Sequence, residues 1–116
     1  MSSTTSWHIG TMGFSYKQWL GPVYPAGMPS RNFLSHYSTL FDTVEIDSTF
    51  YGAPRPESVL RWRQSTPVNF TFCLKTPKAI THESNLVEGI EEMLAFAETA
   101  VLLKEKLGCI LLQFGP

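Results

Sequence analysis

Three residues of the types that transfer protons lie at the ends of apolar segments in this sequence. Glu45 lies in VEIDSTFYGAP (44–54), where Asp47 adds a second carboxylate two positions later. Lys75 ends the apolar run FTFCLK, and His82 follows in PKAITHES. A carboxylate and an imidazole can act as general acid and base, and an ammonium can neutralise an anionic substrate or an oxyanion. Glu45, Lys75 and His82 are therefore our candidate catalytic residues.

Each of these residues also has a structural interpretation. Glu45 and Lys75 could form an ion pair in the interior of the fold, and a single loop histidine is commonly a surface residue. Lys75 could bind an anion or, less readily, form a Schiff base. Glu45, Asp47 and His82 could ligate a metal, but their spacing is not diagnostic, so we predict no metal site. The residues name no cofactor.

Aromatic and hydroxyl side chains accompany the candidate catalytic residues. The loop GTMGFSYKQWLGPVYP (10–25) carries rings that could stack on a sugar or a base, although Trp19 and Tyr24 could equally plug the rim of the fold. It lacks the glycine spacing of a dinucleotide fingerprint. In DSTFYGAP (47–54) we expect Phe50 and Pro54 to serve packing. The candidate substrate-binding residues are Thr11, Tyr16, Trp19, Tyr24, Asp47, Ser48, Thr49, Tyr51 and Gln113.

Four apolar runs, WHIGT, TVEID, FTFCLK and CILLQF, predict the strands that position these residues. Because side chains alternate along a strand, Val44 and Ile46 share one face, while Glu45 and Asp47 project from the other, about 7 Å apart. The later strands repeat this pattern, with Phe70, Phe72, Leu74, Ile110, Leu112 and Phe114 on the apolar face and Thr71, Cys73, Lys75, Cys109, Leu111 and Gln113 on the other. A sheet covered on both faces would be more continuously apolar. The pattern favours a barrel, whose inward residues at the C-terminal ends of the strands line the active site.

Helical spacing between these runs predicts three helices. The first has Ser30 as its N-cap, the second has Pro56 at its first position and ends before Pro67, and the third follows Glu88 and is capped by Gly108. Their apolar positions are Phe33, Leu34, Tyr37 and Phe41, then Val59, Leu60 and Trp62, then Ile90, Met93, Ala97, Ala100 and Val101. Alternating strands and helices predict an α/β fold with parallel strands. We therefore expect a TIM-barrel-like fold, here about half a barrel of four parallel strands and three helices.

Composition limits the domain count and the partners. The 116 residues suffice for a single domain, 1–116, and the net charge of -1 does not favour nucleic acid or a polybasic membrane contact. Cys73 and Cys109 lie in apolar runs, and the sequence shows neither a signal segment nor a membrane span, so we expect buried, unpaired cysteines in a soluble cytoplasmic protein. Charged residues make up only 16% of the chain, so we expect another chain or segment to cover part of the surface.

Five motifs spread over the chain resemble those of the YecE-like proteins, the family known as domain of unknown function seventy-two. They are IGTMGFSYKQW (9–19), VYP (23–25), TVEIDSTFYGAP (43–54), FTFCLKTPKAITH (70–82) and LLQFGP (111–116). The family usually has Ser, Trp and Pro where Met12, Phe14 and Gly115 stand here. The resemblance implies a TIM-barrel-like fold in proteins of roughly twice this length, so the chain corresponds to the N-terminal half of such a barrel. It implies no established reaction.

These observations predict an enzyme that acts on a small polar substrate, sugar-like or phosphorylated, by acid/base chemistry at the C-terminal mouth of the barrel. One alternative is a module that binds a nucleotide or single-stranded nucleic acid without catalysis, although the near-neutral charge makes nucleic acid an improbable partner. Another is a truncated scaffold without activity. Because an open half barrel exposes strand edges, we expect either a longer protein or a homodimer that completes the barrel.

Overall fold

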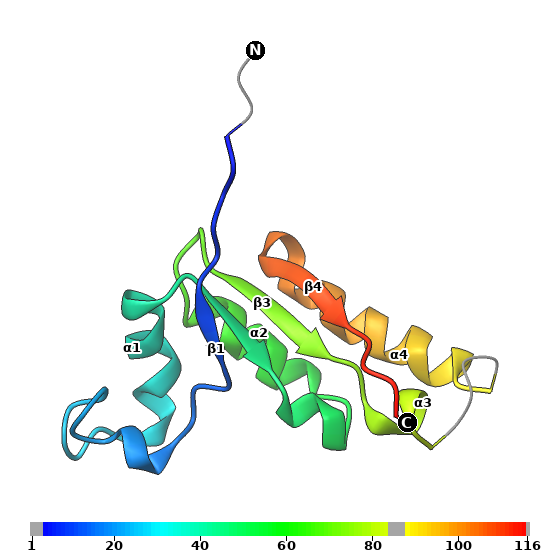
Figure 1. Ribbon diagram of the computed structural model, residues 1–116, viewed down its shortest axis with the longest axis horizontal. Coiled ribbons are helices and arrows are strands. Elements are labelled where there is room, and N and C mark those ends of the chain that lie inside the picture. The colour runs from blue at the N-terminus through cyan, green and yellow to red at the C-terminus, as the bar shows by residue number, and fades with distance from the viewer. Residues whose placement is uncertain (1–3, 84–87, 116) are drawn as a thin grey trace.

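Four short parallel strands form the centre of the computed structural model, which describes residues 4–83 and 88–115 (Figure 1). The strands pair in the order in which they occur in the chain. Their bounds are Gly10–Met12 for β1, Thr43–Ile46 for β2, Thr71–Lys75 for β3 and Leu107–Leu111 for β4. The prediction of an α/β fold with four parallel strands is confirmed.

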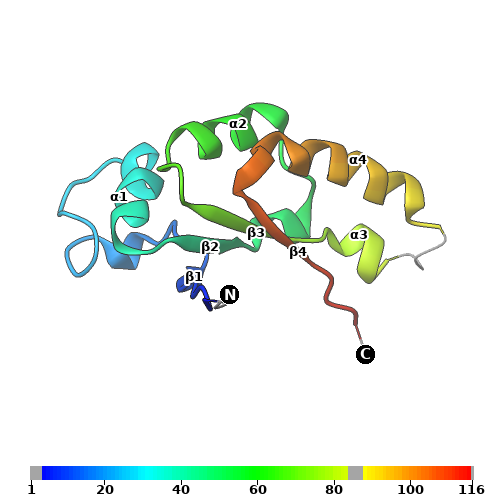
Figure 2. The ribbon, with the colours of Figure 1, turned by 90° about the horizontal axis from the view of Figure 1, so that it is seen from above.

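Helices cover one face of the sheet. The α-helices are Phe33–Leu40 (α1), Pro56–Gln64 (α2), Lys78–Thr81 (α3) and Ile90–Ala100 (α4), and the 3-10 helices are Lys17–Trp19, Ser30–Asn32, Ser48–Tyr51 and Val101–Lys106. Figure 2 shows α1, α2 and α4 on the same side of the strands, as expected when successive crossovers between parallel strands have one hand. These are the three predicted helices, and α3 is an additional turn after β3. None of the helices in the described residues has the length and apolar composition needed to cross a membrane.

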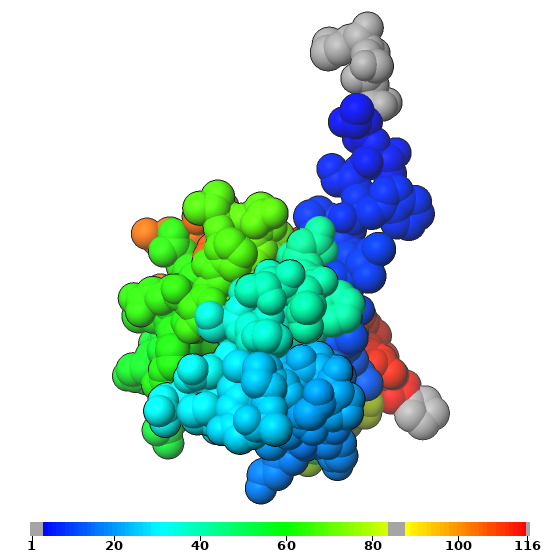
Figure 3. Space-filling model, turned by 90° about the vertical axis from the view of Figure 1, so that its left-hand side faces the viewer, coloured from blue at the N-terminus to red at the C-terminus, as the bar shows by residue number. Residues whose placement is uncertain are grey.

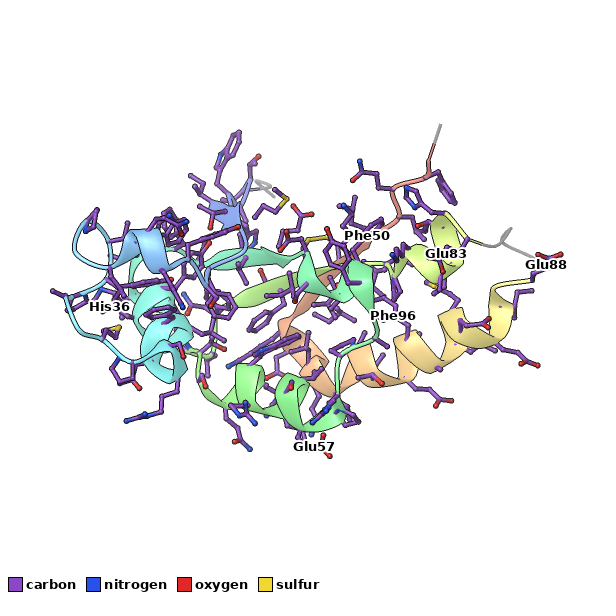
Figure 4. All side chains as sticks on the ribbon, turned by 90° about the horizontal axis from the view of Figure 1, so that it is seen from below. His36, Phe50, Glu57, Glu83, Glu88 and Phe96 are labelled. Carbon is purple, nitrogen blue, oxygen red and sulfur yellow. A yellow bond between two sulfur atoms is a disulfide. The ribbon has the colours of Figure 1, made fainter. Side chains whose placement is uncertain are left out.

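The apolar core lies between the sheet and these helices. Val44 and Ile46 on β2 and Phe72 and Leu74 on β3 are at most 3% exposed, which confirms the predicted apolar face. The helices bury Phe33, Leu34 and Tyr37 from α1, Val59 from α2, and Phe96 and Ala100 from α4. Figure 4 shows Phe96 directed from α4 toward the sheet. Burying each large apolar side chain contributes roughly 1.5–3 kcal/mol, so packing rather than intrinsic propensity fixes these short helices in place.

The buried stripe of α4 differs from the predicted one. Ile90 and Val101, expected to face the sheet, are 53% and 58% exposed, whereas Phe96, Ala100 and Leu103 are buried. The α-helix ends at Ala100 and continues as the 3-10 helix Val101–Lys106, whose tighter turns change the phase of the stripe. Three further residues that we expect on the buried apolar faces are exposed, namely Leu60, Leu112 and Phe114.

Two predicted helix ends are also different in the structure. Ser30 opens the 3-10 helix Ser30–Asn32, and α1 begins only at Phe33, so Ser30 is not its N-cap. Gly108 does not cap a helix, because it lies inside β4.

A buried lysine caps the C-terminal end of α2. Lys106, the last residue of the 3-10 helix Val101–Lys106, is 5% exposed. Its Nζ donates to the carbonyl of Arg63 at 2.7 Å, to the carbonyl of Thr66 at 2.6 Å and to Thr66 Oγ1 at 3.0 Å.

The second face of the sheet is not covered by any described helix. Near the N-terminal ends of the strands, Thr43 Oγ1 donates to the carbonyl of Thr71 at 3.0 Å, and Thr71 Oγ1 donates to Thr43 Oγ1 at 3.1 Å. At Gly10 of β1, an added Cβ would lie 1.9 Å from the carbonyl oxygen of Thr43, so only glycine permits this close approach of β1 and β2. We call this surface the inner face, because it corresponds to the interior of the predicted barrel.

The chain before β1 extends away from the rest of the molecule. Residues 4–9 are exposed, and Figure 3 shows them projecting beyond α1 and the loop that precedes it. Their attachment to the body includes the backbone N–H of Ile9, which donates to Asp42 Oδ1 at 2.9 Å. Asp42 also lies 3.7 Å from His8 Nδ1. This segment contacts the N-terminal end of the sheet, opposite the end that carries the candidate catalytic residues.

Candidate functional site

Glu45 and Lys75 lie on neighbouring strands, on the inner face. Glu45 is in register with Cys73, and Lys75 follows two residues later on the same face of β3. With parallel strands about 4.8 Å apart and a rise of about 3.3 Å per residue, diagonal neighbours of this kind lie roughly 8 Å apart. Among residues 4–83 and 88–115, no carboxylate lies within ion-pairing distance of the Lys75 ammonium. The interpretation of Glu45 and Lys75 as an ion pair is therefore not realised in the described residues.

The ring of Phe50 holds Lys75 and His82 together. Lys75 Nζ lies over the Phe50 ring, 4.4 Å from its centroid. The His82 imidazole meets the same ring edge-on, with centroids 5.1 Å apart and an interplanar angle of 90°. Figure 4 shows Phe50 on the side of the sheet away from Phe96 and from Glu57 of α2. Two of the three candidate catalytic residues thus converge on a single aromatic platform at the C-terminal ends of β2 and β3.

His82 is exposed and lies directly after α3, the additional helical turn. Its Nδ1 lies 2.8 Å from Thr81 Oγ1, and the hydroxyl can donate or accept according to the tautomer of the ring. The chain after β4 returns to this place: a Cβ on Gly115 would lie 2.9 Å from His82 Cδ2. The backbone at Gly115 therefore packs closely on the imidazole, whereas His82 Nε2 makes no described hydrogen bond within residues 4–83 and 88–115.

Tyr16, Asp47 and Ser48 line a cavity of about 330 Å³ at the C-terminal ends of β1 and β2. Trp62 of α2 and Phe14 contribute apolar walls to it. The pKa of Tyr16 is raised, chiefly by burial and then by the negative charges of Asp47 and Glu45, and its protonated hydroxyl donates to the carbonyl of Met12. The predicted binding residues Tyr16, Asp47 and Ser48 are therefore brought together in one concave place.

Four other candidate binding residues make contacts within the fold. Tyr24 is fully buried, and Trp19 stacks on Tyr37 with ring centroids 6.4 Å apart, which matches the alternative in which both rings plug the rim. Thr11 Oγ1 donates to the carbonyl of Gly13 at 2.7 Å and lies 2.9 Å from the Tyr37 hydroxyl. Thr49 is 2% exposed, and its Oγ1 bonds to the carbonyls of Ile46 and Lys75. The hydroxyl of Thr49 thus ties the loop after β2 to the end of β3 and fixes Phe50 above Lys75.

The remaining candidate binding residues, Tyr51 and Gln113, are exposed at the rim of the inner face. Tyr51 is 77% exposed, and Lys78 Nζ lies 5.8 Å from its ring centroid. Gln113 follows β4 and contacts solvent. Among the described residues, no three His, Cys, Asp or Glu side chains are grouped closely enough to hold a metal ion, so Glu45, Asp47 and His82 do not form a ligand set.

The expectation of buried, unpaired cysteines is wrong. Cys73 of β3 and Cys109 of β4 form a disulfide, with their Cα atoms 4.7 Å apart. Figure 4 shows the bond between the two sulfur atoms on the inner face, away from α2 and α4. The alternation of side chains correctly put both residues on this face, but composition gave no sign that they would be paired. Disulfides are uncommon in reducing compartments, so this bond does not support the predicted cytoplasmic setting, which stays a prediction.

Phe50 contacts two of the candidate catalytic residues, whereas the sequence interpretation assigns it to packing. Its position immediately after the carboxylate-bearing strand was visible in the sequence, and an aromatic ring among hydroxyls can bind a cation as well as pack. What the sequence did not show is the helical turn Ser48–Tyr51, which turns the ring back over Lys75.

Comparison with known proteins shows what the whole chain is similar to. The family model "Protein of unknown function DUF72" matches residues 8–116. The UPF0759 protein YecE of Escherichia coli strain K12 is 34% identical in an alignment of length 113 that covers 94% of this chain and 39% of YecE. The UPF0759 protein YunF of Bacillus subtilis strain 168 is 33% identical in an alignment of length 100 that covers 81% of this chain and 36% of YunF. The chain thus spans about two fifths of the length of these relatives.

The fold is similar to that of a solved DUF72 family protein from Thermotoga maritima, with a TM-score of 0.73 and 30% identity. The similarity covers 93% of this chain and 44% of that one. A DUF72 family protein from Enterococcus faecalis gives the same TM-score at 28% identity, over 93% of this chain and 39% of that one. Because the family model covers nearly the whole chain and the relatives share its strands and helices, the chain belongs to the DUF72 family.

Proposed function

We propose that the inner face binds a small anionic molecule, a phosphorylated or carboxylated polar metabolite, and transforms it by acid/base chemistry at the C-terminal ends of β1, β2 and β3. Lys75 neutralises the anionic group and Glu45 and His82 exchange protons on this face, while Tyr16, Asp47 and Ser48 bind the polar remainder at the cavity that Trp62 of α2 also lines. The observation that carries this proposal is the Lys75 ammonium, which lies 4.4 Å from the centre of the Phe50 ring and has no carboxylate partner in the described residues.

An ammonium held in this way is suited to bind an anion. The Phe50 ring attracts a cation by roughly 0.5–2 kcal/mol, which limits the movement of the lysine without neutralising its charge. A neighbouring lysine illustrates the contrast, because Lys78 Nζ lies over Tyr51 but also pairs with Glu83 Oε1 at 3.6 Å. The charge of Lys75 is thus available to a phosphate or carboxylate, whereas that of Lys78 is already compensated.

Glu45 and His82 flank the proposed anion site from two sides. Glu45 projects from β2, one strand away from Lys75, and His82 lies beyond the Phe50 ring. A substrate whose anionic group contacts Lys75 would present its adjacent carbon and oxygen atoms toward Glu45. In this arrangement Glu45 would act as base or acid, and His82 would exchange a proton near the anionic group. The hydroxyl of Tyr16, which donates its proton to the carbonyl of Met12, would accept a hydrogen bond from a polar group of the substrate.

We also propose that further strands close the inner face when the protein is active. Met12 and Leu111 on this face are 55% and 36% exposed, and β1 and β4 are edge strands of the described sheet. The closing strands would come from a longer chain, as in relatives more than twice this length, or from a second copy. Light scattering distinguishes the two: a dimer of the 116-residue chain would support closure by a second copy, and a stable monomer that binds ligand would contradict the need for closure.

Calorimetric binding to phosphorylated and carboxylated metabolites tests the proposed function. Sugar phosphates, hydroxy acids and inorganic phosphate would be titrated into the protein and into its Lys75→Met variant. Because a hydrogen bond to a charged group contributes about 1.5–3 kcal/mol, the variant should lose affinity by about tenfold to a hundredfold. Lys75→Arg should retain part of the affinity, since it keeps the charge.

Lys78→Met is the matched control, because it removes a lysine over an aromatic ring on the same rim whose charge is already paired. It should bind as the unaltered protein does. The role of Glu45 is tested separately with Glu45→Gln, which should preserve binding of the anion and abolish turnover of any metabolite that is transformed. Equal affinities for Lys75→Met and Lys78→Met would overturn the proposal.

A further inference from the structure

We propose that Cys73 and Cys109 form a reversible dithiol–disulfide site that exchanges with small thiols on the inner face. The proposal concerns a second chemistry, independent of anion binding by Lys75. Three features of the described residues carry it: the register that opposes the two cysteines, the exposure of one of them, and the fact that the strands are held together by contacts other than the disulfide.

A local irregularity in the pairing of β3 and β4 brings the cysteines together. Phe72 is in register with Leu107, but the next pair is Cys73 with Cys109, so one residue of β4, Gly108, is left without an opposite residue. In an uninterrupted register Gly108 would oppose Cys73, and Cys109 would oppose Leu74 on the apolar face. Bulges of this kind redirect a side chain to the other face of a sheet.

Gly108 permits this irregularity because it has no side chain. An added Cβ would lie 3.3 Å from the carbonyl oxygen of Phe72 and 3.3 Å from Thr71 Cβ, tighter than ordinary packing. The sequence LGC (107–109) therefore places a glycine where the backbone of β4 must approach β3 before Cys109 turns to the inner face.

The two sulfur-bearing residues differ in exposure. Cys109 is exposed, whereas Cys73 is half-buried between β2 and β4, with Glu45 in register on its other side. A cavity of about 240 Å³ lined by Met12, Glu45 and Cys73 opens next to the bond. Exposed disulfides are the labile ones, because an attacking thiolate can reach the sulfur along the axis of the bond. The geometry thus assigns Cys109 as the sulfur that a small thiol attacks.

Reduction leaves the two cysteines side by side. On either side of the pair, Leu74 is in register with Ile110 and Lys75 with Leu111, and the backbone N–H of Thr76 donates to the carbonyl of Leu111 at 2.9 Å. These ladder contacts do not involve sulfur. The cysteines therefore remain register partners as thiols, and their reoxidation is intramolecular.

Two small thiols reduce the protein disulfide in two successive exchange steps. A thiolate attacks Cys109 Sγ, the bond between the two cysteines breaks, and Cys73 leaves as a thiolate that takes up a proton. A second thiolate attacks the sulfur of the first small thiol in the mixed disulfide, and Cys109 leaves and is protonated in turn. The protein disulfide gains two electrons and two protons, and two small thiols are oxidised to one small-molecule disulfide.

Equilibration of the native protein in mixtures of reduced and oxidised glutathione tests the site. Free thiols are alkylated at each ratio, and the disulfide fraction is measured by intact mass. We expect the fraction to change from fully reduced to fully oxidised across the glutathione range and to agree whether the protein starts reduced or oxidised. Two free thiols in fully oxidised buffer, or a disulfide that opens only after unfolding, would overturn the proposal.

Two single variants test the assignment of the attacked sulfur. In Cys73→Ser the remaining Cys109 is exposed, and in Cys109→Ser the remaining Cys73 is half-buried. With oxidised glutathione, Cys73→Ser should form the mixed disulfide about tenfold faster than Cys109→Ser. Circular dichroism of both variants shows whether each is folded, and alkylation in denaturant confirms that each retains one free thiol. Equal rates in two folded variants, or a faster reaction of Cys73, would overturn the assignment.

Discussion

Removing the ammonium of Lys106 tests how the C-terminal end of α2 is stabilised. Lys106→Met keeps most of the buried apolar stem and deletes the Nζ that donates to the carbonyls of Arg63 and Thr66 and to Thr66 Oγ1. The carbonyl of Arg63 would retain a long hydrogen bond from Thr66 Oγ1 at 3.3 Å, whereas the carbonyl of Thr66 would lose the lysine as its described donor. The variant therefore leaves one buried acceptor unsatisfied and a second one weakly satisfied.

The expected loss of stability follows from these contacts. A buried acceptor without a partner costs about 1–3 kcal/mol, and the weakened second acceptor adds a smaller amount. Part of this is offset, because the variant no longer buries a charge; burial and the nearby Arg63 charge lower the pKa of Lys106, a sign that the ammonium is costly to desolvate. The free energy of unfolding of Lys106→Met should therefore be lower by about 2–3 kcal/mol. At about 4 °C per kcal/mol for a chain of this length, its Tm should fall by roughly 10 °C.

Urea unfolding followed by circular dichroism and tryptophan fluorescence measures this difference. Lys104→Met is the control, since Lys104 lies in the same 3-10 helix but is exposed. It should alter the free energy of unfolding by no more than about 0.5 kcal/mol. If Lys106→Met were as stable as Lys104→Met, the capping role of the buried ammonium would be refuted.

Two further predictions concern stability. Burial, with a smaller contribution from Tyr37, raises the pKa of Tyr24 from 10.0 to about 12, so the folded protein keeps a proton there that the unfolded chain loses. The free energy of unfolding should fall by about 2 kcal/mol between pH 10 and 12 from this group, and Tyr24→Phe should lack this part of the slope in urea titrations; identical slopes would contradict it. Gly10→Ala should lower the free energy of unfolding by about 3 kcal/mol or more in the same titrations, because its Cβ would overlap the Thr43 carbonyl. Gly52→Ala is the control and should leave the free energy of unfolding nearly unchanged, because its Cβ would meet no atom within 4 Å.

Much of the fold follows from the alternation of side chains along the strands. Val44 and Ile46 are buried and Glu45 projects from the other face, as their spacing predicts, because a strand has a fixed period of two. The buried face of α4 was harder to predict, since it depends on where the α-helix gives way to a 3-10 helix at Val101. That change of helix type depends on tertiary packing around Leu103, which local spacing does not encode.

The candidate site was predictable in its position but not in its contacts. The strand ends placed Glu45, Lys75 and His82 at one edge of the sheet, and Lys75 and His82 do converge there. Phe50 was assigned to packing because ring orientation depends on the turn that carries it. The Cys73–Cys109 disulfide was missed because it requires a bulge at Gly108, and a one-residue shift in register is not visible in composition or periodicity.

A titration of the ¹⁵N-labelled protein with inorganic phosphate tests whether Lys75 on its aromatic platform is an anion site. Amide resonances are followed at constant ionic strength, with chloride as the reference anion. We predict saturable shifts at Phe50, Lys75 and His82 that are absent in Lys75→Met. Shifts no larger than those with chloride, or shifts confined to Trp7 and Asp42 at the opposite end of the sheet, would contradict the account.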